Sequence, residues 1–155
     1  MKVQDYLTRH GKPFELLPHP ETYDAQHMAA AVHVPGCKVG KTVVLRLDHD
    51  FRFAVALLPA TRQIDLTRIS RMLGGAVVEL ATESQLAGHC PDCELGAVPP
   101  FGTMYGMMTL VDKSLSLCKE ITFQGNQHCE SIHIKWQDFV DLEHPLVGEF
   151  GVPLP

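Results

Sequence analysis

Two apolar segments follow one another with only three residues between them, and they constrain the fold more than any other feature. The first is residues 42–47 (TVVLRL) and the second is residues 51–58 (FRFAVALL). The connecting residues Asp48, His49 and Asp50 are typical of a turn. A parallel pair of strands needs a crossover of about a dozen residues or more. The short connection therefore predicts an antiparallel hairpin.

Short helical and strand patterns alternate along the rest of the chain. Helices are predicted over residues 2–10, 24–33, 64–73 and 136–142, with a helical turn at 82–85. Further strands are predicted over residues 14–17, 77–80, 107–111, 121–123 and 132–134, followed by a Pro/Gly-rich tail. A length of 155 residues fits one domain of about 150 residues. We expect a single α+β domain over residues 1–155, with a curved, mixed and mostly antiparallel sheet.

The charge balance limits the classes of function. Acidic residues outnumber basic ones by 18 to 13, which gives a net charge of −5 with histidine neutral. This excludes a protein that covers nucleic-acid phosphates with positive charge, but not an enzyme that grips only the end of a nucleic acid. The sequence contains no apolar run of about 20 residues and begins without the apolar stretch of a signal peptide. We expect a soluble, cytoplasmic protein without a membrane partner.

Five cysteines are present: Cys37, Cys90, Cys93, Cys118 and Cys129. Cys90 and Cys93, with His89 beside them, form half of a zinc-site pattern, but a structural zinc needs four ligands. The distant candidates, His128 and Cys129, form no second cluster of that kind. A redox pair fits poorly because a proline-rich loop, not a helix, follows the cysteines. We therefore expect incidental thiols and no metal or other cofactor.

Two features could carry chemistry, although the chain has no nucleophile elbow, phosphate-binding loop or metalloprotease motif. The first is Lys41, at the start of a predicted strand, where a lysine is usually a surface residue that keeps its ammonium in water. The second is residues 96–102 (GAVPPFG). Glycines at both ends allow unusual backbone angles, and two prolines stiffen the loop. Such a loop is either a plain turn or a set of amides that binds a carbonyl or an oxyanion. The residues alone leave both alternatives open.

Three segments together resemble the YbaK family. They are residues 35–45 (PGCKVGKTVVL), residues 96–102 and residues 110–115 (LVDKSL), and the resemblance extends over about residues 20–142. This family comprises free-standing aminoacyl-tRNA deacylases that are similar to the editing domain of bacterial prolyl-tRNA synthetases. The resemblance implies an α+β fold with a mixed, partly barrel-like sheet flanked by helices. It also implies trans-editing, which is the hydrolysis of the ester that links a wrong amino acid to a tRNA.

The resemblance further implies which residues carry the activity. Lys41 would contact the terminal nucleotide or its phosphate, and the loop Gly96, Ala97, Val98, Pro99 and Pro100 would hold the substrate near the scissile carbonyl. The expected substrate-binding residues are Thr22, Tyr23, Thr42, Phe101, Gly102, Asp112 and His128. The expected partner is the aminoacylated acceptor end of a tRNA, with an aminoacyl-tRNA synthetase as a further candidate. Lys38, Lys41, Arg46 and Arg52 could supply local positive charge.

Two alternatives to this function stay open. The domain could be a non-catalytic module that binds a tRNA or a synthetase, or it could hydrolyse another small activated ester. Catalytic and binding versions would keep similar loops, so the sequence does not separate them. Nor does it indicate which amino acid is removed, because one methylene in a pocket changes binding by only about 1–3 kcal/mol.

Overall fold

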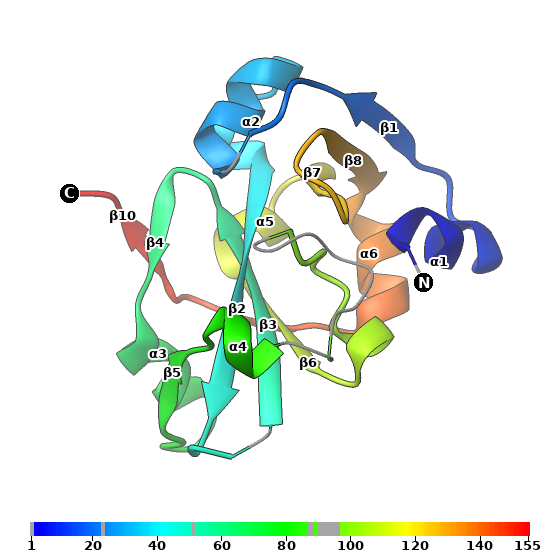
Figure 1. The fold of residues 1–155 in the computed structure, drawn as a ribbon. Coiled ribbons are helices and arrows are strands. Elements are labelled where there is room, and N and C mark those ends of the chain that lie inside the picture. The colour runs from blue at the N-terminus through cyan, green and yellow to red at the C-terminus, as the bar shows by residue number, and fades with distance from the viewer. Residues whose placement is uncertain (1, 23, 51, 87–88, 90–96) are drawn as a thin grey trace.

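A mixed sheet forms the centre of the computed structural model, which describes residues 2–22, 24–50, 52–86, 89 and 97–155. The strand order is β1-β8-β7-β2-β3-β6-β9, with β5 paired to β2, and β4 and β10 form a separate pair (Figure 1). The strands are β1 (Glu15–Pro18), β2 (Val39–Leu47), β3 (Arg52–Pro59), β4 (Arg62–Ile64), β5 (Val78–Leu80), β6 (Met108–Asp112), β7 (Glu120–Gln124), β8 (Glu130–Lys135), β9 (Leu146–Gly148) and β10 (Gly151–Pro153).

Helices surround this sheet. They are α1 (Val3–Arg9), α2 (Ala25–Val32), α3 (Leu66–Met72), α4 (Glu83–Leu86), α5 (Lys113–Ser116) and α6 (Trp136–Glu143), with short 3₁₀ turns η1 (Gly36–Lys38) and η2 (Gly102–Tyr105). In Figure 1, α1 and α6 lie together on the right, α3 lies at the lower left, and α2 lies above the start of β2. Within the described residues, every helix is too short or too polar to cross a lipid bilayer.

The predicted hairpin is confirmed. β2 and β3 pair in antiparallel register, with Val44 opposite Val55. Antiparallel pairs also join β1 to β8, β7 to β8, β2 to β5 and β4 to β10. The pairs β2–β7, β3–β6 and β6–β9 are parallel. The mixed, mostly antiparallel α+β fold expected from the sequence is therefore correct.

The hairpin separates two apolar clusters because successive side chains of a strand point to opposite faces. On one face, Leu45 and Ala54 pack with Ile69 of α3 and with Phe150. On the other, Leu57 joins a cluster that reaches α1, β7, β8 and α6. The helices on the two sides thus hold β2 and β3 rigidly between them.

Side-chain caps decide where two helices begin. Asp24 accepts the amide hydrogen of His27 over 2.8 Å, so α2 starts directly after it. Asp65 accepts from the amides of Thr67 and Arg68, so α3 starts at Leu66. The helix predicted over residues 64–73 therefore begins two residues later than expected, because Ile64 is the last residue of β4.

The C-terminal tail differs most from the expectation. Instead of an irregular tail, the chain forms β9, parallel to β6, and β10, antiparallel to β4. A short helix, α5, also follows β6. Three-residue strands have too few positions to show a period of two, so the pattern of the sequence could not reveal them.

Candidate active site

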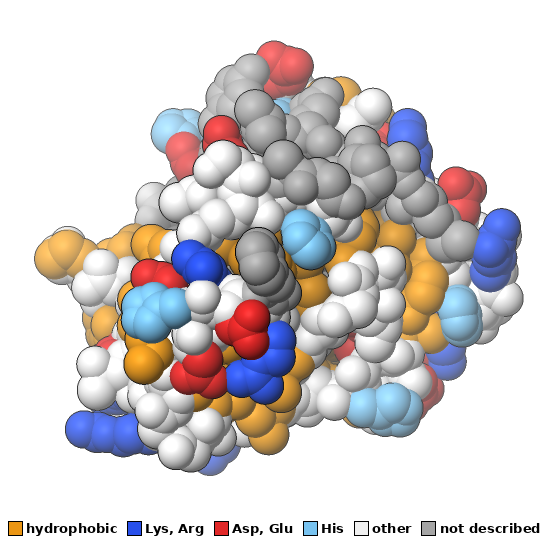
Figure 2. Space-filling model, turned by 60° about the horizontal axis from the view of Figure 1, so that its bottom comes forward, with side chains coloured by type: hydrophobic (Ala, Val, Ile, Leu, Met, Phe, Trp, Pro, Cys, Tyr) orange, Lys and Arg blue, Asp and Glu red, His pale blue; other side chains and the backbone are white. Residues whose placement is uncertain are grey.

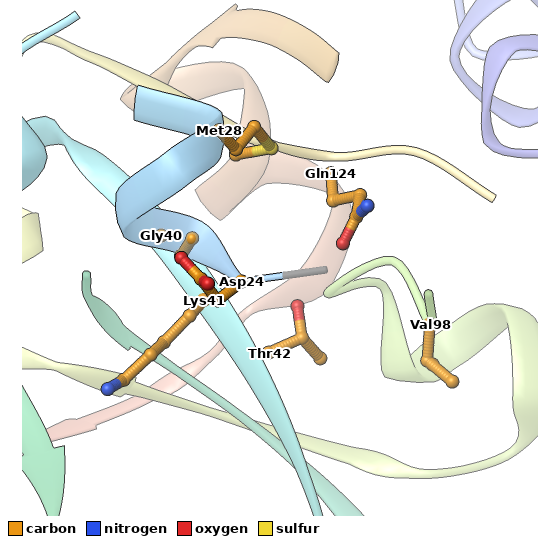
Figure 3. A pocket seen from close by; sticks show the side chains of 8 residues that line it. Asp24, Met28, Gly40, Lys41, Thr42, Val98 and Gln124 are labelled. Atoms are coloured by element: carbon orange, nitrogen blue, oxygen red, sulfur yellow. The ribbon is translucent and has the colours of Figure 1, made fainter. Parts of the chain in front are cut away.

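A pocket of about 230 Å³ opens where the start of α2, the start of β2, the end of β7 and the loop before η2 converge (Figure 3). It contains three of the residues expected at the site, Lys41, Thr42 and Val98. The remaining lining residues are Asp24, Ala25, Met28, Gly40 and Gln124. The fold thus brings the lysine segment and the Gly/Pro loop together across about 55 residues of sequence, as residues 41 and 98 show.

Lys41 and Thr42 are neighbours on β2, and their side chains leave the strand on opposite sides. In Figure 3, Thr42, Val98 and Gln124 lie on one side of β2, and the Lys41 ammonium points away from them on the other. Partial burial lowers the pKa of this ammonium below its ordinary value. Within the described residues, the ammonium has no hydrogen-bond or ion-pair partner. It is a cation available to an anionic ligand at the rim of the pocket.

The other basic residues expected to add positive charge behave differently. Arg46 lies 3.7 Å from Glu79, and Arg52 lies 2.7 Å from Asp48, at the far end of the hairpin. Figure 2 brings this end of the molecule forward and shows Lys and Arg side chains next to Asp and Glu side chains. The structure does not bring these two arginines to the pocket, because Arg46 lies near the end of β2, Arg52 is the first residue of β3, and both charges are paired.

Residues 97–100 of the Gly/Pro loop are packed, not exposed. Ala97 is 1% exposed and Val98 is 9% exposed, and both prolines after them are buried. Their side chains face the protein, and Val98 is the one among these four residues that borders the pocket. The amides of Ala97, Val98 and Phe101 donate to no acceptor in the part of the chain that is described. The loop therefore offers main-chain donors from a rigid support, as an oxyanion site requires.

Hydrogen bonds to Glu143 hold the end of this loop. The amide of Gly102 donates to the Thr109 hydroxyl over 3.0 Å, and that hydroxyl donates to Glu143 Oε1 over 3.2 Å. The amide and the hydroxyl of Thr103 also donate to the same carboxylate. Tyr6 adds a fourth donor at 3.3 Å. Burial raises the pKa of Glu143, and these donors partly oppose that rise.

Phe101 and Gly102 support the pocket and are not among the described residues that line it, so their contact with substrate stays a prediction. Phe101 is fully buried, and its ring meets Phe123 and Phe139 edge to face. A Cβ on Gly102 would lie 2.5 Å from the Met107 carbonyl oxygen. Only glycine allows the chain to approach β6 this closely.

Thr22 and His128 contact Gln124 and are not among the described residues that line the pocket, although they were expected there. The Gln124 amide donates to the Thr22 carbonyl oxygen over 3.2 Å, and the same oxygen lies 3.2 Å from His128 Nδ1. The Thr22 hydroxyl is buried and has no partner among the described residues. These contacts orient Gln124, whose side chain lines the pocket.

Asp112 lies at a different place, so the structure does not bring it to the pocket. Its Oδ1 accepts the amide hydrogens of Phe150 over 3.0 Å and of Gly151 over 2.7 Å. Its Oδ2 accepts from the amide and hydroxyl of Ser114 at the start of α5. A buried carboxylate with four donors is a structural anchor of the C-terminal strand.

The remaining expected residues are Tyr23, Gly96, Cys90 and Cys93, and they lie outside the described residues. Among residues that the structure does describe, no group of three or more His, Cys, Asp or Glu side chains could hold a metal ion.

The aminoacyl-tRNA editing domain is the family whose model matches this sequence, over residues 19–142. The chain belongs to this family. The match includes α2, β2, the loop at Val98 and β7, which together form the pocket.

Known proteins resemble this editing domain along most of its length. The multifunctional Ser/Thr-tRNA deacylase ProXp-y of Escherichia coli K12 is 23% identical over 150 residues, which cover 93% of this chain and 87% of the relative. The solved structure of the hypothetical protein APE2540 matches with a TM-score of 0.85 and 18% identity, over 97% of this chain and 99% of the other. That of a candidate trans-editing enzyme for prolyl-tRNA synthetase matches with a TM-score of 0.84 and 20% identity, over 97% and 94%. These structures share the fold.

Sequence reasoning missed two residues of the editing domain that shape the site. Gln124 directly follows the predicted strand 121–123 and is the last residue of β7, but the expectation was placed on His128, four residues later. Glu143 ends an amphipathic helix and reads as a surface residue. Its burial depends on Thr103 and Thr109, which are about 40 and 34 residues away, as their numbers show.

Proposed function

We propose that this editing domain hydrolyses the ester that joins an amino acid to the 3′ end of a mischarged tRNA. One observation carries the proposal: Val98, whose amide has no acceptor among the described residues, borders a pocket that also holds Lys41, whose ammonium has no partner among those residues. Charge develops on the carbonyl oxygen of the ester during hydrolysis, while the nucleic acid carries its charge on phosphate. The site offers a donor of the right kind for each group.

The loop would stabilise the transition state. When water attacks the ester carbonyl, its oxygen gains negative charge, the carbon–oxygen bond to the ribose breaks, and the ribose leaves as a hydroxyl. An amide aimed at the developing oxyanion contributes about 2.7–4 kcal/mol. Because an aminoacyl ester is already activated, such donors and a fixed orientation of the ester can suffice without a nucleophilic side chain.

Lys41 would bind the nucleic acid and take no part in the chemistry at the carbonyl. Its ammonium points away from Thr42 and Val98, so it would meet a phosphate at the rim while the aminoacyl group enters between them (Figure 3). Its lowered pKa reflects partial burial of the charge, and no counter-ion lies beside it among the described residues. A phosphate would supply that counter-ion.

The lining of the pocket favours an amino acid with a polar side chain. Thr42, Gln124 and Asp24 contribute polar groups to it. The E. coli relative is named for Ser- and Thr-tRNA, which makes seryl and threonyl esters the first substrates to test.

The test is a panel of mischarged tRNAs, with release of the amino acid measured for the wild type, Lys41→Ala and Arg52→Ala. Arg52 is the matched control, since it is a basic residue at the far end of the hairpin that lies 2.7 Å from Asp48. We expect hydrolysis by the wild type and by Arg52→Ala, and a rise in KM for Lys41→Ala. Binding of tRNA without release of any amino acid would favour the non-catalytic module instead.

A further inference from the structure

β2 has a gap on the side away from β3. On that side β7 pairs with Val39 and Gly40, and β5 pairs with Leu45, Arg46 and Leu47. Among the described strands, none pairs with residues 41–44 on this side. The sheet is thus open for a short distance beside a strand that is otherwise paired on both sides.

Two main-chain hydrogen bonds establish which groups of β2 face the gap. The Val44 carbonyl oxygen accepts the amide hydrogen of Ala81, which follows β5, over 2.9 Å. The Val39 carbonyl oxygen accepts from Ala60, which follows β3, over 2.8 Å. Main-chain groups alternate in direction along a strand, so the odd-numbered residues of β2 direct theirs toward β3. The even-numbered residues of β2 direct theirs to the other side. The N–H and C=O of Thr42 and the N–H of Val44 face the gap.

These groups are unpaired. The register of β2 with β7 ends at Gly40, so no ladder bond reaches Thr42. Across the residues described here, neither the amide of Thr42 nor that of Val44 donates to another group, and the Thr42 carbonyl accepts from none. Buried or half-buried main-chain groups almost always have partners. Unpaired groups beside a pocket are therefore positioned for a ligand.

Two pockets meet at this gap. The first is the pocket already described, and the second, of about 240 Å³, is lined by Thr42, Val43, Val44, Leu80, Ala81, Glu83, Leu86 and Val98. Thr42 and Val98 belong to both. The open main chain of β2 therefore lies at the junction, with the Gly/Pro loop beside it.

We propose that this gap binds the main-chain atoms of the aminoacyl group, as one residue added to the sheet. The α-ammonium of the substrate donates to the Thr42 carbonyl, and the ester carbonyl accepts from the Thr42 amide. This is the exchange of two bonds that an antiparallel pair of residues makes. The proposal rests on the proposed function and adds how the amino acid is recognised whatever its side chain.

The length of the gap determines its occupant. β7 closes it at Gly40 and β5 closes it at Leu45, so a longer peptide strand cannot pass. A single aminoacyl unit needs one donor and one acceptor on one residue, and Thr42 supplies both. The carbonyl oxygen of the ester has two lone pairs, so it can accept a hydrogen bond from the Thr42 amide and another from a loop amide at the same time.

The test observes the Thr42 amide directly by NMR. The ¹⁵N-labelled protein is titrated with 3′-deoxy-3′-(L-serylamino)adenosine, in which an amide replaces the ester, and hydrogen exchange is measured. Binding should slow exchange at Thr42 by about tenfold, the value of one good hydrogen bond. The amide of Arg46 is the matched control, because it lies on the same edge of β2 but within the ladder to β5.

Two variants give an independent readout. Thr42→Val removes the hydroxyl and keeps the main chain, while Thr42→Pro also removes the N–H without breaking a ladder bond. The proline variant should lose about tenfold more kcat/KM than the valine variant. Unchanged exchange at Thr42 at the highest analogue concentration overturns the proposal, whether or not other amides respond. Deacylation by the wild type is scored separately, so failure of the proposed function is a distinct result.

Discussion

Thr109 donates its hydroxyl hydrogen to Oε1 of Glu143 over 3.2 Å, in the interior between β6 and the end of α6. The same hydroxyl accepts the amide hydrogen of Gly102, where the Gly/Pro loop ends. A continuous path of hydrogen bonds thus connects the last residue of a helix to the loop beside the pocket. The geometry of the loop depends on a carboxylate that the local sequence does not indicate.

Replacement of Glu143 by glutamine should change how stability depends on pH. Burial raises the pKa of Glu143 above 4.5, its ordinary value, so the folded protein holds this proton more tightly than the unfolded chain. The contribution is therefore fully present at low pH and is lost as pH rises through the raised pKa. Denaturation at several pH values should show that Glu143→Gln gains stability relative to the wild type as pH rises above 4.5 and through the raised pKa. A constant difference between the two proteins would contradict this.

Thr22→Val should stabilise the protein. The Thr22 hydroxyl is buried and unpaired among the described residues, and valine fills the same space without a polar group. We expect the free energy of unfolding to rise by about 1 kcal/mol. Because Thr22 acts on Gln124 through its carbonyl oxygen, kcat/KM should stay within about twofold of the wild type. A large fall in kcat/KM would show instead that the hydroxyl contacts substrate.

Asp112→Ala separates anchoring from catalysis. Without the carboxylate, the buried amides of Phe150 and Gly151 lose their acceptor. The free energy of unfolding should fall by about 2 kcal/mol or more. Below the new melting temperature, deacylation by the folded protein should match the wild type. Loss of activity in a fully folded variant would return Asp112 to the substrate-binding role expected from the sequence.

The charge of Lys41 should make tRNA binding depend on pH. Its pKa is lowered in the free protein, and a bound phosphate would raise it. Binding therefore takes up a proton once pH exceeds the lowered pKa, so the Kd should increase as pH rises through that value. The Kd is measured at increasing pH with an acceptor-stem minihelix that carries no amino acid, so that no ester is hydrolysed. The Kd of Lys41→Ala should change less with pH than that of the wild type. An identical pH dependence in the two proteins would contradict a contact between Lys41 and phosphate.

The sequence predicted those elements of the fold that depend on residues close together along the chain. The hairpin of β2 and β3 follows from two apolar segments and a three-residue turn, and the start of α2 follows from Asp24. β10 could not be predicted in this way, because Gly151 pairs with Ile64, far away along the chain.

Some features of the candidate site were predicted from the sequence, and others were not. Lys41, Thr42 and Val98 were expected together because the resemblance to the YbaK family implied it, and all three line one pocket. The burial of Phe101 depends on aromatic partners from β7 and α6, which no local pattern reveals. The opposite directions of Lys41 and Thr42 follow from strand geometry alone and support the two separate substrate contacts that we propose for them.

The central claim is that amides of the Gly/Pro loop stabilise the transition state, and Pro100→Ala tests it most directly. Single-turnover deacylation and thermal unfolding should be measured on the same preparation, with Pro13→Ala, at an exposed position, as the control. Greater freedom of the loop should lower the rate about tenfold or more, while the free energy of unfolding falls by only about 1 kcal/mol. An unchanged rate, or one that falls only in proportion to the unfolded fraction, would contradict the account.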